Sequence, residues 1–464
     1  MGDTEIMLPS GETPRDGRPP LLSHRAWWVA ALAAAVAMVA GVVLAWVRAP
    51  APTPVAAPSP GPTPSTSLVA GQTLAVAPAY PGVPVPVRGY YWGGTNNHDT
   101  STVPGCALPS TYSGAGQVYG GLECKINWAA KQLKLTAPAA TPGRFHTSMA
   151  RAYLDGDLAC RDQQSRLKPG GDIYGLATAP GRRVLMLSTR CGPWKALADG
   201  GGRAPEDSYV RQLVDLVEKF PVPVILVMNH EPEDEACDPA TGMGTPDDFR
   251  RAFRQFATDV RTEDARDGRI SISLGWILMN ATFLTGAHGD HLPFTGCDAS
   301  TAKNTRVDNP LRNPENWYPG DDAVDWIAAD VYTHGTDKSL RNAVKPFVNW
   351  VSAPCPQSHP LRDWTCTAAR AHRPLALGEF GPGLAKTAPP TQAQKAAWLN
   401  QFRSDLNNPA VHEFSRIKAF AYWSSGGQNV IDMPPDPTHP ALRAYTLLTL
   451  QPLGLSPQLA PAPG

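Results

Sequence analysis

Short apolar runs recur between about residues 70 and 452, at intervals of roughly 35 to 55 residues, and each is followed by a polar loop and a helix-like pattern. Such alternation predicts β-strands joined by crossover helices. The runs cover residues 88–92, 145–153, 184–188, 222–228, 270–278, 326–331, 374–378 and 417–422. Eight parallel strands with crossover helices predict an α/β fold, the (β/α)8 barrel of the TIM type, whose active site lies where the strands end.

Two of the intervening helices have clear sequence signatures. The segment 246–261 places phenylalanines at helical spacing, and Thr245 before it is a predicted N-cap. The segment 208–220 carries one apolar face, made of Val210, Leu213, Val214 and Val217. Both patterns fit helices that pack on a sheet.

Residues 27–47 form a run of 21 residues without a charge. At about 1.5 Å per residue a helix over this run is roughly 31 Å long, which matches a bilayer core. More arginines precede the run than closely follow it, which favours a cytoplasmic N-terminal side. A cleaved signal peptide is the alternative, but its apolar region is usually about 7–15 residues long. We therefore predict an uncleaved single-pass anchor.

The composition around this run predicts five parts. Residues 1–25 are polar and predict a disordered cytoplasmic tail, residues 26–48 the transmembrane helix, and residues 49–69 a linker whose first 19 residues hold seven prolines and no charge. Residues 70–452 are the predicted barrel domain, and residues 453–464 a disordered tail. The predicted location is the cell membrane, with the barrel domain extracellular.

All eight cysteines follow the predicted anchor. An even count in that position indicates disulfides in an oxidising compartment. The shortest-loop pairing joins sequential neighbours: Cys106 with Cys124, Cys160 with Cys191, Cys237 with Cys297, and Cys355 with Cys366. No Cys/His cluster has zinc spacing, so neither a structural metal site nor a cofactor is predicted.

The charges balance, with 41 Lys plus Arg against 41 Asp plus Glu. A chain without net charge has no global field that attracts nucleic acid or an anionic membrane face. We expect no nucleic-acid partner, and a neutral substrate is favoured.

Two glutamates follow two of the predicted strands directly. The run 222–228 ends in Asn-His-Glu-Pro-Glu, with Glu231 at its centre, and the run 374–378 ends in Glu379-Phe-Gly. The fourth and seventh strands lie on opposite sides of an eight-stranded barrel, so both side chains can reach one mouth. Retaining glycosidases need such a pair, an acid and a nucleophile about 5–5.5 Å apart. The alternative is that each is a solvated or capping carboxylate in a loop.

These motifs resemble those of a known group of enzymes. An Asn/His-Glu pair after strand four, with Gly-Glu-Phe-Gly at strand seven, resembles the clan of retaining (β/α)8 glycosidases, and His230 before Glu231 is most similar to glycoside hydrolase family 26, the β-mannanase family. The resemblance implies Glu231 as acid/base and Glu379 as nucleophile. It also implies that Tyr332 hydrogen-bonds the nucleophile and that Trp423 forms the floor under the reacting sugar. Residues 89–93 loosely resemble the family's first strand.

Three further residues are candidates for substrate contact. Trp194 follows a strand end and could stack on a sugar, His230 could tune the acid or bind a hydroxyl, and Arg151 could keep Glu379 ionised. The alternatives are packing roles for Tyr332 and His230 and a surface position for Arg151. The loop 233–237 lacks the tryptophan-rich run that mannanases carry after the acid/base, so the sequence does not identify which β-linked glycan is the substrate.

The sequence therefore predicts a membrane-anchored, extracytoplasmic, retaining and endo-acting glycosidase for a β-linked polysaccharide or oligosaccharide. A transglycosylase acting on a cell-surface polymer and an inactive glycan-binding barrel are the alternatives. A third is a metal-dependent hydrolase that holds a cation with His230, Glu231, Glu233 and Asp234, although no second histidine stands at helical spacing.

Overall fold

The structure is a computed structural model. It describes residues 82–95, 119–134, 147–154, 163–179, 181–200, 209–266, 268, 271–286, 294, 296–297, 310–333, 339–354, 370–382, 390–423, 439–450 and 458–459. Contacts divide the chain into Met1–Gln72 and Thr73–Gly464, and every described residue belongs to the second unit. The predicted cytoplasmic tail, transmembrane helix and linker lie outside the described residues. Within the described part, no helix is long and apolar enough to cross a bilayer.

Eight strands form one parallel sheet in the order β2-β9-β8-β7-β6-β5-β4-β3. They are β2 Tyr91–Thr95, β3 Met149–Tyr153, β4 Val184–Ser188, β5 Val224–His230, β6 Ile272–Met279, β7 Trp326–Tyr332, β8 Leu375–Gly381 and β9 Ile417–Trp423. Each predicted run overlaps one of these strands, so the eight-strand prediction is confirmed. The fourth run begins at Val224 instead of residue 222, because Pro223 has no N–H to donate to a neighbouring strand.

The sheet curls until its two outer strands meet. The backbone N–H of Trp92 on β2 donates to Ser148 Oγ, beside β3, at 2.9 Å. Gly93 lies so close to β3 that a Cβ on it would be 2.2 Å from the carbonyl oxygen of Met149. The sheet is therefore a nearly closed barrel, as the sequence predicts.

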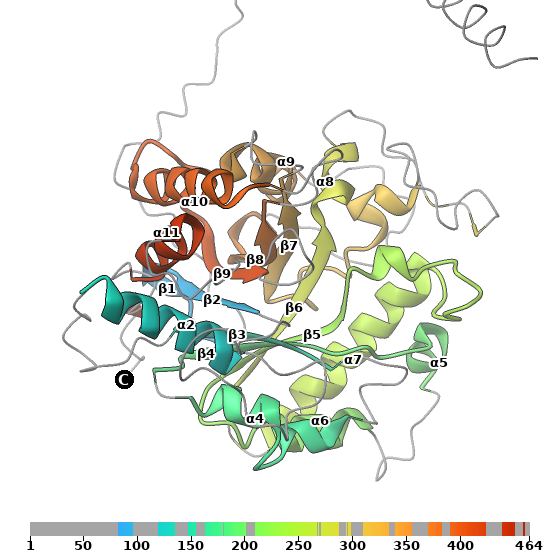
Figure 1. Cartoon of the computed structure of the whole chain (residues 1–464). Coiled ribbons are helices and arrows are strands. Elements are labelled where there is room, and N and C mark those ends of the chain that lie inside the picture. The colour runs from blue at the N-terminus through green and yellow to red at the C-terminus, as the bar shows by residue number, and fades with distance from the viewer. Residues whose placement is uncertain are drawn as a thin grey trace, which may run out of the picture. The chain divides into compact units, whose positions relative to one another are not determined.

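Helices surround the strands (Figure 1). They are α2 Tyr119–Gln132, α4 Asp172–Ala177, α5 Trp194–Ala198, α6 Tyr209–Val217, α7 Pro246–Arg266, α8 Asn280–Gly286, α9 Leu340–Ser352, α10 Gln392–Asn407 and α11 Pro440–Thr449. Helix α7 begins where Thr245 accepts the backbone N–H of Asp248 at 3.1 Å, while the Asp248 carboxylate accepts the N–H of Thr245 at 3.0 Å. The predicted N-cap at Thr245 is confirmed, and the reciprocal bonds satisfy donors that a helix start leaves unpaired.

The barrel interior is filled by side chains. A buried cluster inside it includes Tyr91, Met149, Met186, Ile225, Ile277 and Trp326. A second, larger cluster lies between strands and helices and holds Trp92, Phe380 and Phe420. Because the interior is packed, chemistry is confined to the rim where the strands end.

Strand β1 Pro86–Arg88 pairs antiparallel with β10 Gln458–Leu459. The sequence places residues 458–459 in a disordered tail, and the structure corrects this, because the pairing supplies their backbone hydrogen bonds. Just before β1, the N–H of Val83 donates to Ser273 Oγ at 2.8 Å, near the start of β6. Val83 also joins the interior cluster and so covers the end of the barrel opposite the predicted site.

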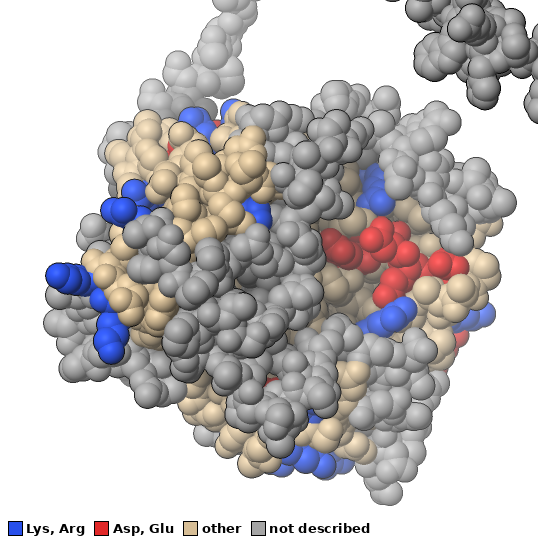
Figure 2. Space-filling model, viewed as in Figure 1, with Lys and Arg blue, Asp and Glu red and all other residues tan. Residues whose placement is uncertain are grey.

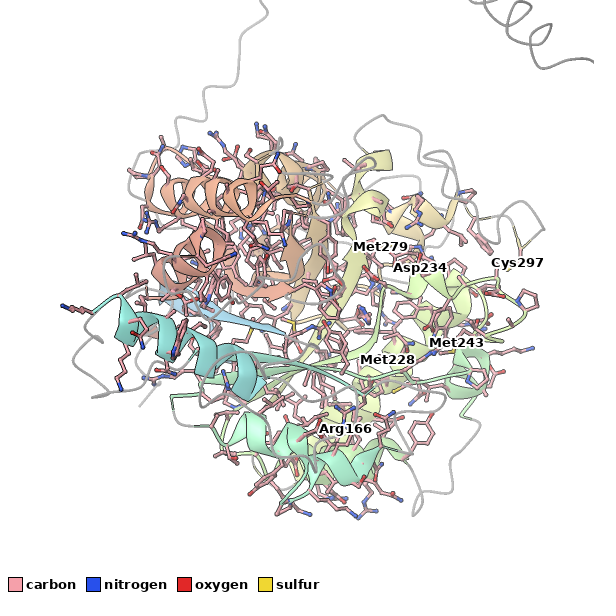
Figure 3. All side chains as sticks on the ribbon, in the orientation of Figure 1. Arg166, Met228, Asp234, Met243, Met279 and Cys297 are labelled. Atoms are coloured by element: carbon pink, nitrogen blue, oxygen red, sulfur yellow. A yellow bond between two sulfur atoms is a disulfide. The ribbon has the colours of Figure 1, made fainter. Side chains whose placement is uncertain are left out.

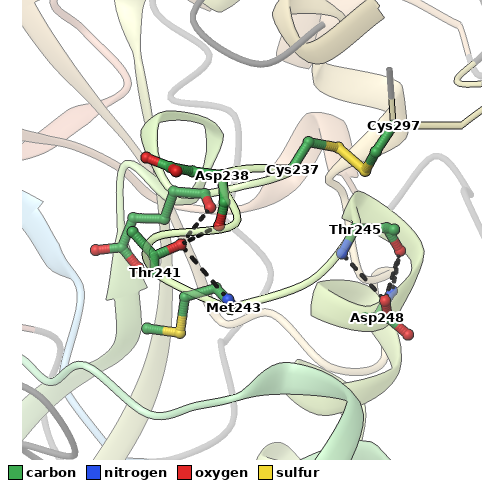
Figure 4. Close-up of a disulfide and its surroundings, with 8 residues drawn as sticks. Cys237, Asp238, Thr241, Met243, Thr245, Asp248 and Cys297 are labelled. Atoms are coloured by element: carbon green, nitrogen blue, oxygen red, sulfur yellow. Dashed lines mark hydrogen bonds between the residues drawn. A yellow bond between two sulfur atoms is a disulfide. The ribbon is translucent and has the colours of Figure 1, made fainter. Parts of the chain in front are cut away.

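A disulfide joins Cys237 and Cys297, whose Cα atoms are 5.3 Å apart (Figure 4). The predicted pairing of these two cysteines is confirmed. Cys191 is disulfide-bonded as well. The other predicted pairs include cysteines outside the described residues. The Cys237–Cys297 bond ties the loop after β5 to a residue that follows α8 in the chain.

We expect Gly93→Ala to lower the free energy of unfolding by about 2 kcal/mol or more, because the added methyl group meets backbone that a side-chain rotation cannot move. The matched control is Gly175→Ala in α4, where no atom lies within 4 Å of the added Cβ. Alanine there should be neutral or stabilising by up to about 1 kcal/mol. Thermal unfolding of both variants measures the difference, and equal melting temperatures would contradict the close seam.

Candidate active site

The ends of β5 and β8 bring Glu231 and Glu379 to the same place on the rim. The imidazole Nε2 of His230 lies 3.5 Å from Glu379 Oε1 and 3.9 Å from Glu231 Oε2. One ring nitrogen therefore lies between the two carboxylates that the sequence singles out. Closure of the parallel sheet brings the ends of β5 and β8 to one rim and produces this arrangement.

Both carboxylates follow an irregularity in their strand. On β5, Val227 pairs with Gly275 but His230 pairs with Ile277, so β5 carries one extra residue ahead of His230. On β8, Leu377 pairs with Ala329 while Glu379 pairs with Asp330, which makes Gly378 the extra residue. Such bulges redirect the side chains that follow them and are frequent next to active sites.

The backbone at each bulge has a specific demand. A Cβ on Gly378 would lie 2.6 Å from Asp330 Oδ1, so only glycine lets β8 approach β7 this closely. Glu231 has φ 50° and ψ 51°, the left-handed region that non-glycine residues rarely adopt. Holding a residue there costs about 1–3 kcal/mol, and such strain clusters at functional sites.

Two tyrosines hold the Glu379 carboxylate. The hydroxyl of Tyr153, at the end of β3, donates to Oε1 at 2.5 Å, and the hydroxyl of Tyr332, at the end of β7, donates to Oε2. The hydrogen bond expected from Tyr332 is thus present. Burial, followed for Tyr332 by the charge of Glu379, raises the pKa of both hydroxyls well above the usual value, so both remain donors.

Arg151 acts on this group through Tyr153. Its Nε donates to the Tyr153 hydroxyl at 3.0 Å, and its guanidinium carbon lies 4.4 Å from the centre of the tyrosine ring. Its side chain is fully buried. Because Tyr153 in turn donates to Glu379, this contact links the positive charge of Arg151 to the carboxylate that the sequence expects it to keep ionised.

The surroundings of Glu231 favour its protonated form. Burial is the largest cause that raises its pKa well above the usual value, followed by the negative charges of Asp330 and then Glu379. Asp330 lies in β7 and is buried, and burial followed by the charge of Glu379 raises its own pKa as well. Burial and negative neighbours both disfavour ionisation, so Glu231 can carry a proton at a pH where an ordinary glutamate cannot.

The sequence patterns predicted no role for Tyr153 or Asp330, although each stands at a notable position. Tyr153 is the last residue of the predicted strand 145–153, and Asp330 is the one charged residue in the predicted strand 326–331. A charge inside an apolar strand is rare unless it is paired or functional.

The two predicted stacking tryptophans have different surroundings. Trp423 ends β9, is partly exposed, and meets Tyr153 edge-to-face with ring centres 5.6 Å apart. Trp194 is fully buried against Phe249 and Trp317, and its Nε1 donates to Asn229 Oδ1 at 3.4 Å. A ring enclosed in this way offers no face to a sugar. Trp194 therefore packs in the core instead of binding substrate, because helix α7 packs over it through Phe249.

The acidic loop after Glu231 is fastened at three points. Buried Glu233 accepts the backbone N–H of Met279 at 2.7 Å, Asp234 lies 3.6 Å from Arg312, and Glu235 lies 2.9 Å from Arg190. In Figure 3 Asp234 lies beside Met279 at the end of β6, and Figure 2 shows acidic side chains gathered on this face, flanked by basic ones. Glu233 and Asp234 are thus engaged on the side of β6 and do not join His230 in the cation site that the sequence allowed.

No protein-family model and no curated protein matches the chain. Among solved structures, the catalytic domain of a Bacillus sp. JAMB-750 family 26 endo-β-1,4-mannanase is 15% identical with a TM-score of 0.45, and the alignment covers 78% of this chain and 85% of that chain. A modular Cellulomonas fimi endo-β-1,4-mannanase is 15% identical with a TM-score of 0.44 and coverages of 81% and 76%. A Bacillus subtilis mannanase is 10% identical with a TM-score of 0.38 and coverages of 76% and 86%.

The buried carboxyl group of Glu233 makes the stability of the fold depend on pH. Burial raises its pKa to about 7, above the usual 4.5. The folded state therefore holds this proton more tightly than the unfolded state, and the stability it contributes is lost as the pH rises from about 4.5 through about 7. In the parent, the free energy of unfolding should fall by on the order of 1–3 kcal/mol across this window. We expect Glu233→Gln, which cannot ionise, to lack this decrease.

Denaturant unfolding at a series of pH values between 4 and 8 measures this effect. The free-energy curves of the parent and of Glu233→Gln should diverge as the pH rises. Parallel curves would show that Glu233 does not hold a proton in the folded state.

Proposed function

We propose that this protein is a retaining glycoside hydrolase that cleaves a β-linked polysaccharide through a covalent glycosyl-enzyme. Glu379 is the nucleophile and Glu231 the general acid/base. The supporting observation is the placement of His230 Nε2 between Glu231, whose pKa is raised, and Glu379, whose two oxygens each accept a tyrosine hydroxyl. This pair has the two unequal carboxyl environments that the retaining reaction requires.

In the first half-reaction, a Glu379 oxygen attacks the anomeric carbon while Glu231 gives its proton to the leaving glycosidic oxygen. The bond between the anomeric carbon and the leaving oxygen breaks, and an ester to Glu379 forms. The hydroxyls of Tyr153 and Tyr332 orient the carboxylate for this attack. Holding a nucleophile in its reactive geometry before substrate binds lowers the entropic part of the barrier.

In the second half-reaction, Glu231 acts as a base. Formation of the ester removes the negative charge of Glu379, which is one of the charges that raise the pKa of Glu231. The pKa of Glu231 then falls, and the ionised group takes a proton from water as the water attacks the anomeric carbon. Glu379 leaves as a carboxylate, and the product keeps its anomeric configuration.

The surroundings favour a neutral glycan. The acidic groups of Asp330 and Asp234 lie close enough to raise the pKa of Glu231, so the carboxylate of a uronate would add one more acid to this crowded group and is disfavoured. Trp423 presents a partly exposed ring next to Tyr153 and supplies an apolar platform for the reacting sugar. Endo action on a β-linked chain is the proposed mode.

The proposed location is the outer face of the cell membrane. The uncharged run 27–47 and the arginines before it support a single-pass anchor with the barrel domain outside. The disulfide between Cys237 and Cys297 is consistent with an oxidising compartment.

A mechanism-based 2-deoxy-2-fluoro glycoside with a good leaving group should label Glu379. The fluorine slows both half-reactions, and the good leaving group restores the rate of ester formation only, so the ester accumulates. Peptide mass mapping identifies the labelled residue. Glu379→Ala should lose activity by about 10⁴-fold or more, as expected when a covalent nucleophile is removed. A label on another residue, or full activity of Glu379→Ala, would show that the nucleophile lies elsewhere.

Glu231→Ala should retain formation of the intermediate from substrates with a good leaving group such as dinitrophenol, since these need no proton. Deglycosylation then becomes slow, and azide should accelerate it by replacing the activated water. Substrates with poor leaving groups should lose about 10²–10⁴-fold.

Glu233→Gln is the matched control, because Glu233 is two residues away but bonded to β6. Azide should not accelerate this variant. If azide rescues Glu233→Gln and not Glu231→Ala, the acid/base assignment moves to Glu233.

A further inference from the structure

We propose that His230, Glu231 and Asp330 form a binding site for a divalent transition-metal ion of the Zn²⁺ type. The inhibitory consequence of this site rests on the function proposed above, whereas the binding itself does not. An ion held here occupies the Glu231 oxygen that must donate the proton, so the occupied protein is catalytically blocked.

The three donor groups already converge. One ring nitrogen of His230 and one carboxylate oxygen each from Glu231 and Asp330 lie within 4.8 Å of one another. In a tetrahedral zinc site the ligand atoms lie about 3.3–3.6 Å apart, because each is about 2.0–2.2 Å from the metal. Movements of about 1 Å bring the three donor atoms to that spacing. The partly exposed side chains of His230 and Glu231 have room for such movements.

Asp330 supports a ligand at this point. It is 2% exposed, and neither of its carboxylate oxygens has a hydrogen-bond partner among the residues that the structure describes. The backbone N–H of Glu379 lies near enough to favour its ionised form but does not satisfy the group. Buried polar atoms without a partner are uncommon in folded proteins, and a bound cation gives a partner to the oxygen that coordinates it.

The charge and chemistry of the cluster favour a transition metal. Glu379 adds a third carboxylate, 3.5 Å from His230. The positive charge of Arg151, which contacts the ring of Tyr153, also acts on Asp330. One imidazole nitrogen with two carboxylate oxygens is a donor set suited to Zn²⁺, whereas Mg²⁺ and Ca²⁺ prefer oxygen alone. Three protein ligands leave a fourth position for water.

Titration calorimetry of the full chain with zinc chloride, after removal of metals by a chelator, tests the proposal. We expect one tight site per chain, with affinity reduced at least about tenfold in both His230→Gln and Asp330→Asn. Two variants are needed because Asp330 is buried, whereas His230 is 30% exposed and tolerates substitution more readily. Thermal unfolding confirms that each variant folds.

His412→Gln is the matched control, because it removes a histidine that is exposed at the surface. This variant should bind zinc like the parent. Absence of binding, or affinity unchanged in His230→Gln and Asp330→Asn, overturns the proposal, and so does tighter binding of Mg²⁺ than of Zn²⁺.

Activity on a glycan panel separates this proposal from the proposed function. Zinc should inhibit glycan cleavage with a midpoint that matches the calorimetric affinity, and EDTA should restore the rate. Zinc binding that depends on His230 and Asp330, in a protein that cleaves no glycan, leaves the metal site standing and overturns the glycosidase. Zinc binding without inhibition of an active enzyme overturns the inhibitory site.

Discussion

Parallel pairing of eight strands that close on themselves is the constraint on which the rest of this structure depends. It forces the carboxyl ends of β5 and β8 onto one rim, so residues 148 positions apart in the chain share one histidine nitrogen. Closure requires close backbone approach at Gly93, and the packed interior around Trp326 keeps the strands at a fixed separation. A looser barrel would place the two glutamates too far apart to act on one bond.

Within this frame the two glutamates are held by different means. Glu379 lies in a strand and is fixed by one hydroxyl from the adjacent strand β7 and one from β3, which is not adjacent to it. Glu231 lies past its strand in a strained conformation, and the loop behind it is fastened through Glu233 and the disulfide of Cys237. The strained backbone conformation of Glu231 persists because these contacts hold the loop on both sides and leave it few other conformations. One carboxyl group is therefore rigid and buried, and the other keeps a partly exposed side chain.

The proton on Glu231 and the proposed metal ion have the same physical origin. Burial and the neighbouring charges of Asp330 and Glu379 disfavour a bare carboxylate at Glu231. A proton relieves that repulsion, and so does a divalent cation. The proposed catalytic form and the proposed metal-bound form are then two ways to neutralise one crowded group of acids, and the concentration of free metal decides between them.

The sequence by itself determined the eight strands, the N-cap at Thr245 and the positions of two glutamates at strand ends. These follow from local patterns, namely apolar runs and capping residues. The pairing of Cys237 with Cys297 is one of many that eight cysteines allow, and the tertiary structure decided it. Only the tertiary structure decided that Trp194 is enclosed, that Arg151 acts through Tyr153, and that Asp330 lies against Gly378. Those outcomes depend on bulges, strand register and helix packing, which bring together residues far apart in the chain, and no local pattern in a single sequence records such contacts.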